Sequence, residues 1–416
     1  MQVALDKFMG KCSCGHSHRI SVRQIFIEPN ASQRLESFLS PYHCPVFICD
    51  TNTRKATGSV LSAYYKKYTV IELPPKDLHA DNKNVNTLLK SIDDKTDLLI
   101  AVGSGTIHDL TRYCASHRGI PFISMPTAAS VDGFVSTVAA MTWNGLKKTL
   151  PAAAPIIVLA DTEIFSRAPY RLTASGISDL MGKYTALADW EIAHLVTGEH
   201  FCRRIYDLEM QALTEVEQVL GDIQSGNKDS MEKLMYALIL SGLAMQMMGN
   251  SRPASGAEHH ISHLWEMHVV NDPIDALHGE KVSVGLLLTL EKYQKILGAI
   301  RSGTCRVVNH REFETSLLKE TFGKEGLYEG ILEENGENIL TPIDLNLLEK
   351  QLPGIAAILE KLPTYDCMYE KLKKAGCTTS MQDLKLPDIK DLTLTLSPYV
   401  RRRLTLMRLS KLFELS

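Results

Sequence analysis

The chain has 416 residues, with 45 basic and 48 acidic side chains and a formal net charge of −3. This near-neutral balance argues against a nucleic-acid-binding protein, which needs a basic surface to displace counterions from phosphates. Apolar residues make up 44% and charged residues 22%, as in ordinary globular proteins, and the length is sufficient for two large domains.

The longest apolar stretch, residues 234–249, is interrupted by Ser241 and Gln246 and is shorter than the ~18–20 residues that span a bilayer. The first residues lack the basic-then-apolar pattern of a secretory signal. Nine scattered cysteines fit a reducing compartment better than a disulfide framework. We therefore expect a cytoplasmic protein without stable membrane insertion.

A cluster of metal-binding residue types lies near the start of the chain, in CSCGHSH: Cys12, Cys14, His16 and His18. A small zinc site is one interpretation of this cluster. Its spacing is tighter than that of most structural zinc sites, however, and no second half lies nearby in the sequence. The preferred interpretation is a short hairpin that leads into a strand.

The first 165 residues alternate short apolar runs with helical patterns. The predicted strands are 45–50, 68–73, 97–103, 121–125 and 155–161. Runs that are apolar throughout are typical of parallel strands covered by helices on both faces. With predicted helices at 84–93 and 106–118, the pattern indicates a Rossmann-like, doubly wound α/β domain.

The pattern becomes helical after residue 165. The predicted helices are 172–196, 205–222, 231–248, 257–268 and 282–297, and prolines interrupt the helix-compatible runs that follow. We therefore expect an α/β dinucleotide-binding domain over residues 1–165. An all-helical metal- and substrate-binding domain is expected over residues 166–416.

Two turns that follow predicted strands carry small and polar residues. In Gly103-Ser104-Gly105-Thr106 a glycine turn leads into a helix, an arrangement in which backbone N–H groups can bind a pyrophosphate. A simple tight turn remains the alternative. Asp50 ends another strand and would either accept the ribose hydroxyls or cap a helix. The second turn, residues 126–133, offers hydroxyl groups and Asp132 to a cofactor or substrate.

Possible metal ligands concentrate in three segments of the helical half. Asp179 lies in GISDLMGK, His278 lies in HGE, and His259 and His263 are one helical turn apart in SGAEHHISHLWE. One carboxylate and two imidazoles leave coordination positions open, which is typical of a catalytic cation. A polar helix face is the alternative. His260 is interpreted as structural.

These segments together resemble the sn-glycerol-1-phosphate dehydrogenase family, which shares its fold with glycerol dehydrogenase and dehydroquinate synthase. The matching stretches occur in the family's order between residues 97 and 290: AVGSGTIHDLTRY, PTAASVDGFVSTVAAM, APYRLTASGISDLMGKYTALADW, NSRPASGAEHHISHLWEM and ALHGEKVSVG. The N-terminal strand and SPYVRRRLTLMRL are also similar, and the GSGT and LADW segments resemble the bacterial branch of the family.

The resemblance assigns roles to the matching positions. It implies Asp179, His259 and His278 as metal ligands, Asp132, Asp179 and His263 as substrate contacts, and Asp179 and His263 as catalytic residues. The implied dinucleotide site comprises Asp50, Gly105, Thr106, Ile107, His108, Asp109, Thr127, Ser130 and Ser136.

The implied reaction is the reversible reduction of dihydroxyacetone phosphate by NADH or NADPH to sn-glycerol 1-phosphate, with a role in phospholipid biosynthesis. The implied cofactors are NAD(H) or NADP(H) and one divalent transition metal, which the ligand set does not identify among zinc, nickel, cobalt and iron. The implied assembly is a homodimer. The alternatives are a dehydrogenase of another polyol or polyol phosphate, a dehydroquinate-synthase-like lyase, and a non-catalytic nucleotide- or metal-binding protein.

Overall fold

The computed structural model describes residues 1–415, which form two compact units. The first unit comprises residues 1–144, 148–180 and 207–251, and the second comprises residues 145–147, 181–206 and the chain from Arg252 onward. Residues 207–251 lie beyond the expected boundary at residue 165 and belong to the first unit. The functional division into a cofactor domain and a metal domain stays a prediction.

A parallel six-stranded sheet forms the centre of the first unit. Its strands follow the order β3-β10-β7-β6-β4-β5. Their bounds are Gln24–Glu28 (β3), Pro45–Asp50 (β4), Thr69–Leu73 (β5), Leu98–Gly103 (β6), Phe122–Pro126 (β7) and Ile157–Asp161 (β10). In the centre of the sheet, Ile100 of β6 pairs with Phe47 of β4 and with Ile123 of β7. The five predicted strands are confirmed.

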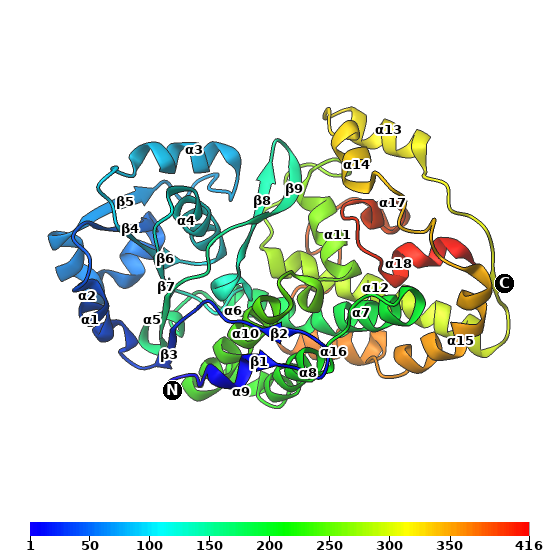
Figure 1. The fold of residues 1–416 in the computed structure, drawn as a ribbon, viewed down its shortest axis with the longest axis horizontal. Coiled ribbons are helices and arrows are strands. Elements are labelled where there is room, and N and C mark those ends of the chain that lie inside the picture. The colour runs from blue at the N-terminus through cyan, green and yellow to red at the C-terminus, as the bar shows by residue number, and fades with distance from the viewer. Residues whose placement is uncertain (416) are drawn as a thin grey trace. The chain divides into compact units, whose positions relative to one another are not determined.

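Helices cover both faces of this sheet (Figure 1). On one face Val46, Leu99 and Ala101 pack against α3 (Asn82–Ser91) and α4 (Gly105–Arg118). On the other face Phe47 and Ile100 pack against α1 (Leu35–Leu39) and α2 (Thr51–Lys67). Successive residues of a strand therefore enter opposite cores, which explains why these runs are apolar at every position. The doubly wound α/β fold is confirmed.

Two hairpins and further helices complete the first unit. The hairpin β1–β2 (Gly10–Lys11 and Ser17–His18) precedes β3, as the sequence predicted. A second hairpin joins β8 (Val138–Trp143) to β9 (Leu146–Pro151). The helices are α5 (Thr162–Phe165), α6 (Tyr170–Met181), α8 (Arg203–Glu217), α9 (Leu220–Gln224) and α10 (Lys228–Met248).

The second unit is helical apart from the small β11–β12 ladder (Cys305–Val307 and Phe413–Leu415). Its helices are α7 (Lys183–Thr197), α11 (Ala257–Glu266), α12 (His278–Arg301), α13 (Thr315–Gly323), α14 (Tyr328–Asn335), α15 (Leu345–Leu359), α16 (Tyr365–Lys374), α17 (Lys390–Leu396) and α18 (Leu406–Leu409). Its largest core joins apolar residues of α7, α12, α15 and α18.

Two long helices predicted from the sequence are each divided. The expected helix 172–196 is interrupted at Gly182, which ends α6 and caps α7. The expected helix 205–222 is interrupted between α8 and α9. Among residues 1–415, no helix is both long and apolar enough to cross a membrane.

Candidate active site

The turn between β6 and α4 forms an open helix N-terminus. Ser104 is the N-cap of α4, and its side chain makes no capping hydrogen bond. The first N–H groups of a helix lack acceptors within the helix, so they are available to an anion. A Cβ atom on Gly105 would lie 3.2 Å from Val131, so this position leaves little room for a side chain. The turn has the form that a pyrophosphate requires.

The order of the sheet places this turn at its topological switch point. The strand that follows β4 in the chain, β5, lies on one side of β4, and β6 lies on the other. The carboxyl ends of such strands flank the usual ligand crevice of an open α/β sheet. Asp50 ends β4 and caps α2, since its Oδ1 accepts hydrogen bonds from the N–H groups of Asn52 and Thr53. Asp50 therefore caps a helix, which was one of its two expected roles. Its contact with a ribose stays a prediction.

Two other residues predicted for the cofactor site, His108 and Asp109, contact the protein interior. His108 Nδ1 lies 2.9 Å from the Ser104 carbonyl oxygen, and Nε2 lies 2.8 Å from the Ser124 hydroxyl. Burial lowers the pKa of His108 to about 3, so its ring is neutral. Asp109 lies 3.5 Å from Arg112, whose guanidinium donates to the Ser136 carbonyl. His108 therefore connects the start of α4 to β7, and Arg112, paired with Asp109, braces the loop that carries Ser136.

The hydroxyl residues after β7 line the same part of the first unit. Thr127 is buried, and its N–H donates to the carbonyl of Gly103. The Ser136 hydroxyl accepts a hydrogen bond from the Val138 N–H. The Ser130 hydroxyl is buried and has no hydrogen-bond partner among the described residues. An orphaned hydroxyl beside the helix N-terminus is consistent with a ligand contact, because buried polar groups are normally paired.

The structure brings Asp132 and Asp179 together within the first unit. The Asp132 N–H donates to Asp179 Oδ2 at 3.0 Å, and the Ser241 hydroxyl lies 2.9 Å from Asp132 Oδ2. Helix α6 reaches this loop through Gly176, where a Cβ atom would lie only 2.0 Å from the Ala129 carbonyl oxygen. The close approach of α6 therefore fixes where the buried Asp179 carboxylate lies.

In the second unit, a buried carboxylate orients the first candidate ligand. His259 Nδ1 lies 2.7 Å from Glu258 Oε1, and Glu258 also accepts from the Thr185 hydroxyl at 2.6 Å. Burial opposes ionisation of Glu258, but the hydrogen bonds, first from His259 and then from Thr185, outweigh it and lower the pKa. An ionised Glu258 holds the proton on Nδ1, which leaves Nε2 as the ligand atom.

A second carboxylate orients the other two histidines. Glu266 lies 3.3 Å from His263 Nδ1 and 3.1 Å from His278 Nδ1. Ring centroids of His259 and His278 are 5.3 Å apart, and those of His263 and His278 are 5.8 Å apart. His263, Glu266 and His278 also offer ligand atoms that lie within 4.8 Å of one another. The three predicted histidines therefore form one cluster.

Basic side chains surround this histidine cluster. Lys147 lies 2.8 Å and Lys281 3.3 Å from the carboxylate oxygens of Glu266. Burial, together with the nearby charges of Arg401 and Lys147, holds the pKa of His263 well below its usual range. Lys147, Lys281 and Arg401 outnumber the carboxylates Glu266 and Glu334, and an excess of positive charge favours a bound anion.

In the motif SRPASGAEHH, Arg252 has a structural role, whereas both ring nitrogens of His260 lack a hydrogen-bond partner among the described residues. Arg252 is buried and donates to Glu199 and to the carbonyl groups of Asp189 and Leu404. His260 is buried, with burial and the charge of Arg403 holding its pKa well below its usual range. Arg252 therefore connects segments of the second unit.

Sequence reasoning missed the groups that orient the ligands. Glu258 and Glu266 flank the predicted histidines in the motif AEHHISHLWE, so their positions carried a usable signal. Lys147 lies more than a hundred residues away in β9, and nothing in its local sequence marks it.

Known proteins resemble this chain in sequence and in fold. A family model described as iron-containing alcohol dehydrogenase matches residues 26–169. The chain is 35% identical to a glycerol-1-phosphate dehydrogenase (NAD(P)+) from Geobacillus thermodenitrificans, over 86% of this chain and 90% of the relative. It is 32% identical to one from Halalkalibacterium halodurans, over 95% and 94%.

A solved structure with the same fold is an archaeal halo-thermophilic alcohol dehydrogenase from a Red Sea brine pool. It covers 92% of each chain with a TM-score of 0.63 at 13% sequence identity, a similarity that concerns the fold alone. The two relatives above share more than 30% identity over nine tenths or more of their length, and the family predicted from the motifs is confirmed. The chain belongs to the NAD(P)+-linked glycerol-1-phosphate dehydrogenase family.

Proposed function

We propose that this chain catalyses the reversible reduction of dihydroxyacetone phosphate to sn-glycerol 1-phosphate, with NADH or NADPH as the reductant. The observation that carries the proposal is the cluster of His259, His263 and His278, each with Nδ1 beside a carboxylate. This arrangement presents Nε2 atoms to a metal or substrate, and it occurs in a chain of the glycerol-1-phosphate dehydrogenase family.

Asp179, His259 and His278 are the proposed ligands of one divalent transition metal. The donor set fits such an ion, because neutral imidazoles and a carboxylate suit zinc, nickel or iron. Support comes from the Nδ1–carboxylate contacts of His259 and His278, since metal-binding histidines commonly carry such partners. Asp179 completes the set by the family resemblance.

The proposed dinucleotide site combines the N-terminus of α4 with the loop after β7. The N–H groups of Gly105–Ile107 would bind the pyrophosphate, and the orphaned Ser130 hydroxyl would contact the cofactor together with Thr127. Asp50 would accept the ribose hydroxyls. Asp109 and Ser136 complete the proposed site, and Arg112 holds the loop that carries Ser136. His108 would act indirectly, because its hydrogen bond to Ser124 positions the start of α4 against β7.

When bound, the dinucleotide supplies the hydride and the metal polarises the carbonyl group. Asp132 and Asp179 would hold the hydroxyl end of the substrate. In the oxidation direction His263 would accept the proton of the substrate hydroxyl at Nε2, because its ring is neutral and Glu266 holds Nδ1. The imidazolium formed in this way would return the proton to the product oxygen when the ketone is reduced. Lys147 and Arg401 would bind the phosphate, which accounts for the excess of cations around Glu266.

A side-by-side assay of nicotinamide absorbance tests the proposal with dihydroxyacetone phosphate, dihydroxyacetone and glycerol. We expect the phosphorylated ketone to be preferred by several powers of ten in kcat/KM. Unpaired donors in a phosphate site cost ~1–3 kcal/mol each, and ~1.4 kcal/mol corresponds to a factor of ten. A preference for an unphosphorylated polyol would identify a polyol dehydrogenase. The absence of net NADH consumption would point to a lyase of the same fold.

Chelation provides an independent test of the metal. Dialysis against a strong chelator should abolish activity, and a divalent transition metal should restore it, because a three-ligand site releases its ion to a competitor. The variants Asp179→Ala, His259→Ala and His278→Ala should each lose this metal. Full activity of the chelated protein would contradict the assignment.

We infer that the enzyme is a cytoplasmic homodimer. The cysteine content supports the compartment, since the nine thiols of the described residues are free of disulfides. The family resemblance supports the dimer. Light scattering coupled to size-exclusion chromatography should give a mass about twice that of one chain.

A further inference from the structure

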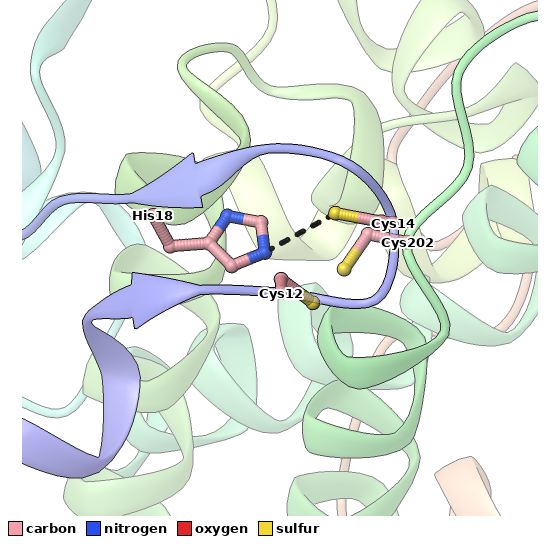
Figure 2. Close-up of side chains that lie close together, drawn as sticks. All are labelled: Cys12, Cys14, His18 and Cys202. Carbon is pink, nitrogen blue, oxygen red and sulfur yellow. Dashed lines mark hydrogen bonds between the residues drawn. The ribbon is translucent and has the colours of Figure 1, made fainter.

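The N-terminal hairpin β1–β2 brings three metal-binding side chains together. The Cys12 N–H donates to the carbonyl of His16 at 2.9 Å, and the Gly15 N–H donates to that of Cys12 at 3.1 Å. Gly15 has a φ of +88°, which a side chain would disfavour. This tight turn folds Cys12 and Cys14 back toward His18 at the end of β2 (Figure 2).

The distances within this group match those of a tetrahedral zinc site. The candidate ligand atoms of Cys12, Cys14 and His18 all lie within 4.8 Å of one another. Cys14 Sγ lies 3.6 Å from His18 Nε2. Zinc–sulfur and zinc–nitrogen bonds of about 2.3 and 2.0 Å place such a pair of ligand atoms about 3.5 Å apart in a tetrahedron.

The histidine is held in the orientation of a ligand. His18 is buried, and its Nδ1 lies 2.8 Å from the carbonyl oxygen of Met247 near the end of α10. With Nδ1–H donating to this carbonyl, Nε2 carries a lone pair and faces the two thiols. An imidazole fixed by a backbone carbonyl is a common partner arrangement in zinc sites.

The hairpin is short and mostly exposed. Each strand has two residues, and three of these four residues are exposed. Isolated two-stranded hairpins are marginal in water, and small elements without an apolar core depend on disulfides or metals. Cys12 and Cys14 form no disulfide. Figure 2 also labels Cys202, which belongs to the second unit.

We propose that Cys12, Cys14 and His18 bind a structural zinc ion that fixes the hairpin to the end of α10. Two thiolates with one imidazole select zinc over hard cations. The ion is chemically distinct from the proposed catalytic metal, whose ligands include no thiolate. The Ser21 N–H donates to Gln246 Oε1 at 2.7 Å, so the segment after the hairpin contacts the same end of α10.

Metal content and cobalt spectroscopy of the full chain test this site. The protein is purified without chelator, and zinc is measured by mass spectrometry in the wild type and in Cys12→Ser, Cys14→Ser and His18→Phe. Each variant should hold about one equivalent of metal less than the wild type. After exchange with cobalt, the wild type should show near-ultraviolet absorption from thiolate-to-cobalt charge transfer. This absorption should persist when Asp179→Ala has removed the catalytic metal.

Matched controls separate this site from general thiol or histidine effects. Cys44→Ser and His43→Ala alter exposed residues of the same types and should keep the zinc and the absorption. His18→Cys keeps a ligand in place and should retain zinc if the variant folds. The three ligand variants should keep dehydrogenase activity at low temperature but unfold at a lower temperature than the wild type. Unchanged zinc in the ligand variants, or a wild-type cobalt spectrum without thiolate bands, would overturn the proposal.

Discussion

Glu258 Oε1 lies 2.7 Å from His259 Nδ1, between two adjacent residues of one helix. Neighbours in a helix point in different directions, so this contact requires Glu258 to bend back along α11. The contact is maintained because the same carboxylate also accepts from the Gly256 N–H at 2.7 Å and from Thr185. The orientation of His259 is therefore set by the N-terminal turn of its own helix.

The Glu258→Gln variant should bind the catalytic metal about 10–100-fold more weakly, because the amide cannot stabilise the Nδ1 proton as the carboxylate does. Competition with a chromophoric chelator measures the affinity. Glu291→Gln serves as the control, since Glu291 forms only partly exposed ion pairs with Lys295 and Lys390. Equal metal affinities for the wild type and Glu258→Gln would show that Glu258 does not support metal binding.

Arg401 and Arg402 offer a matched pair for the phosphate contact. Arg401 is half-buried beside Glu266, whereas Arg402 is exposed and pairs with Glu337. Arg401→Met should lower kcat/KM for dihydroxyacetone phosphate about 10–100-fold, because a hydrogen bond to a charged group contributes ~1.5–3 kcal/mol. The reaction of unphosphorylated dihydroxyacetone should not change. A similar loss in Arg402→Met would indicate a general charge effect.

Substituting Asp50 should affect both stability and cofactor binding, and Asp81, which also caps a helix, serves as the control. Asp50→Ala should lower the stability of the first unit by about 1 kcal/mol through loss of the α2 cap, and it should also weaken dinucleotide binding. Asp81 caps α3 in the same way. Asp81→Ala should give a similar loss of stability and an unchanged cofactor affinity. Calorimetric titration with NADH distinguishes the two, and equal affinities would leave Asp50 as a cap alone.

His108 should make the stability of the chain depend on pH. Burial lowers its pKa to about 3 in the folded chain, whereas the ordinary pKa of a histidine is near 6.5. Between these two pH values the unfolded chain binds a proton at His108 and the folded chain does not. Its contribution is complete above pH 6.5 and is lost as the pH falls toward 3, with a slope of up to ~1.4 kcal/mol per pH unit. His108→Gln should reduce this slope in urea unfolding between pH 6.5 and 4. Identical slopes would contradict the assignment.

Gly176 and Gly58 should respond to alanine in opposite ways. A Cβ atom at Gly176 would meet the Ala129 carbonyl oxygen, whereas one at Gly58 would have nothing within 4 Å. Gly176→Ala should destabilise the first unit by at least ~1–3 kcal/mol, because α6 would be pushed from the loop before Asp132. Gly58→Ala should stabilise α2 by ~0.4–1 kcal/mol. Thermal unfolding of both variants tests the comparison.

The strands of the large sheet were predictable because burial on both faces leaves an uninterrupted apolar run, as in PVFICD and DLLIAVG. Helix α2 was not predicted, since its sequence TNTRKATGSVLSAYYKK is largely polar and buries only Thr57 and Leu61 fully. The interruption at Gly182 was also missed. A glycine within a helical pattern signals only a small loss of helix propensity, so it does not show that one helix ends there and another begins.

The candidate site also contains some features that the sequence predicts and others that it does not. The histidines and Asp179 lie in motifs whose residue types and spacing are visible in the sequence. The contact between Asp132 and Asp179 depends on how closely α6 approaches a loop 47 residues away. The cationic surroundings of Glu266 depend on Lys147, which lies more than a hundred residues earlier in the chain. Long-range placement of this kind leaves no local pattern.

The parallel pairing of β3 with β10 joins Ile25 to Val158, and His18 contacts Met247 further along the chain. During synthesis on the ribosome, β3 therefore has no partner strand in the sheet until residue 161 has emerged. The β1–β2 hairpin likewise lacks its contact with Met247 until α10 has been synthesised. At ~5–20 residues per second, these two delays range from several seconds to most of a minute. A nascent chain that stops at residue 165 would carry all six strands of the sheet but lack α6, α8 and α10, so its apolar surfaces would be exposed to chaperones.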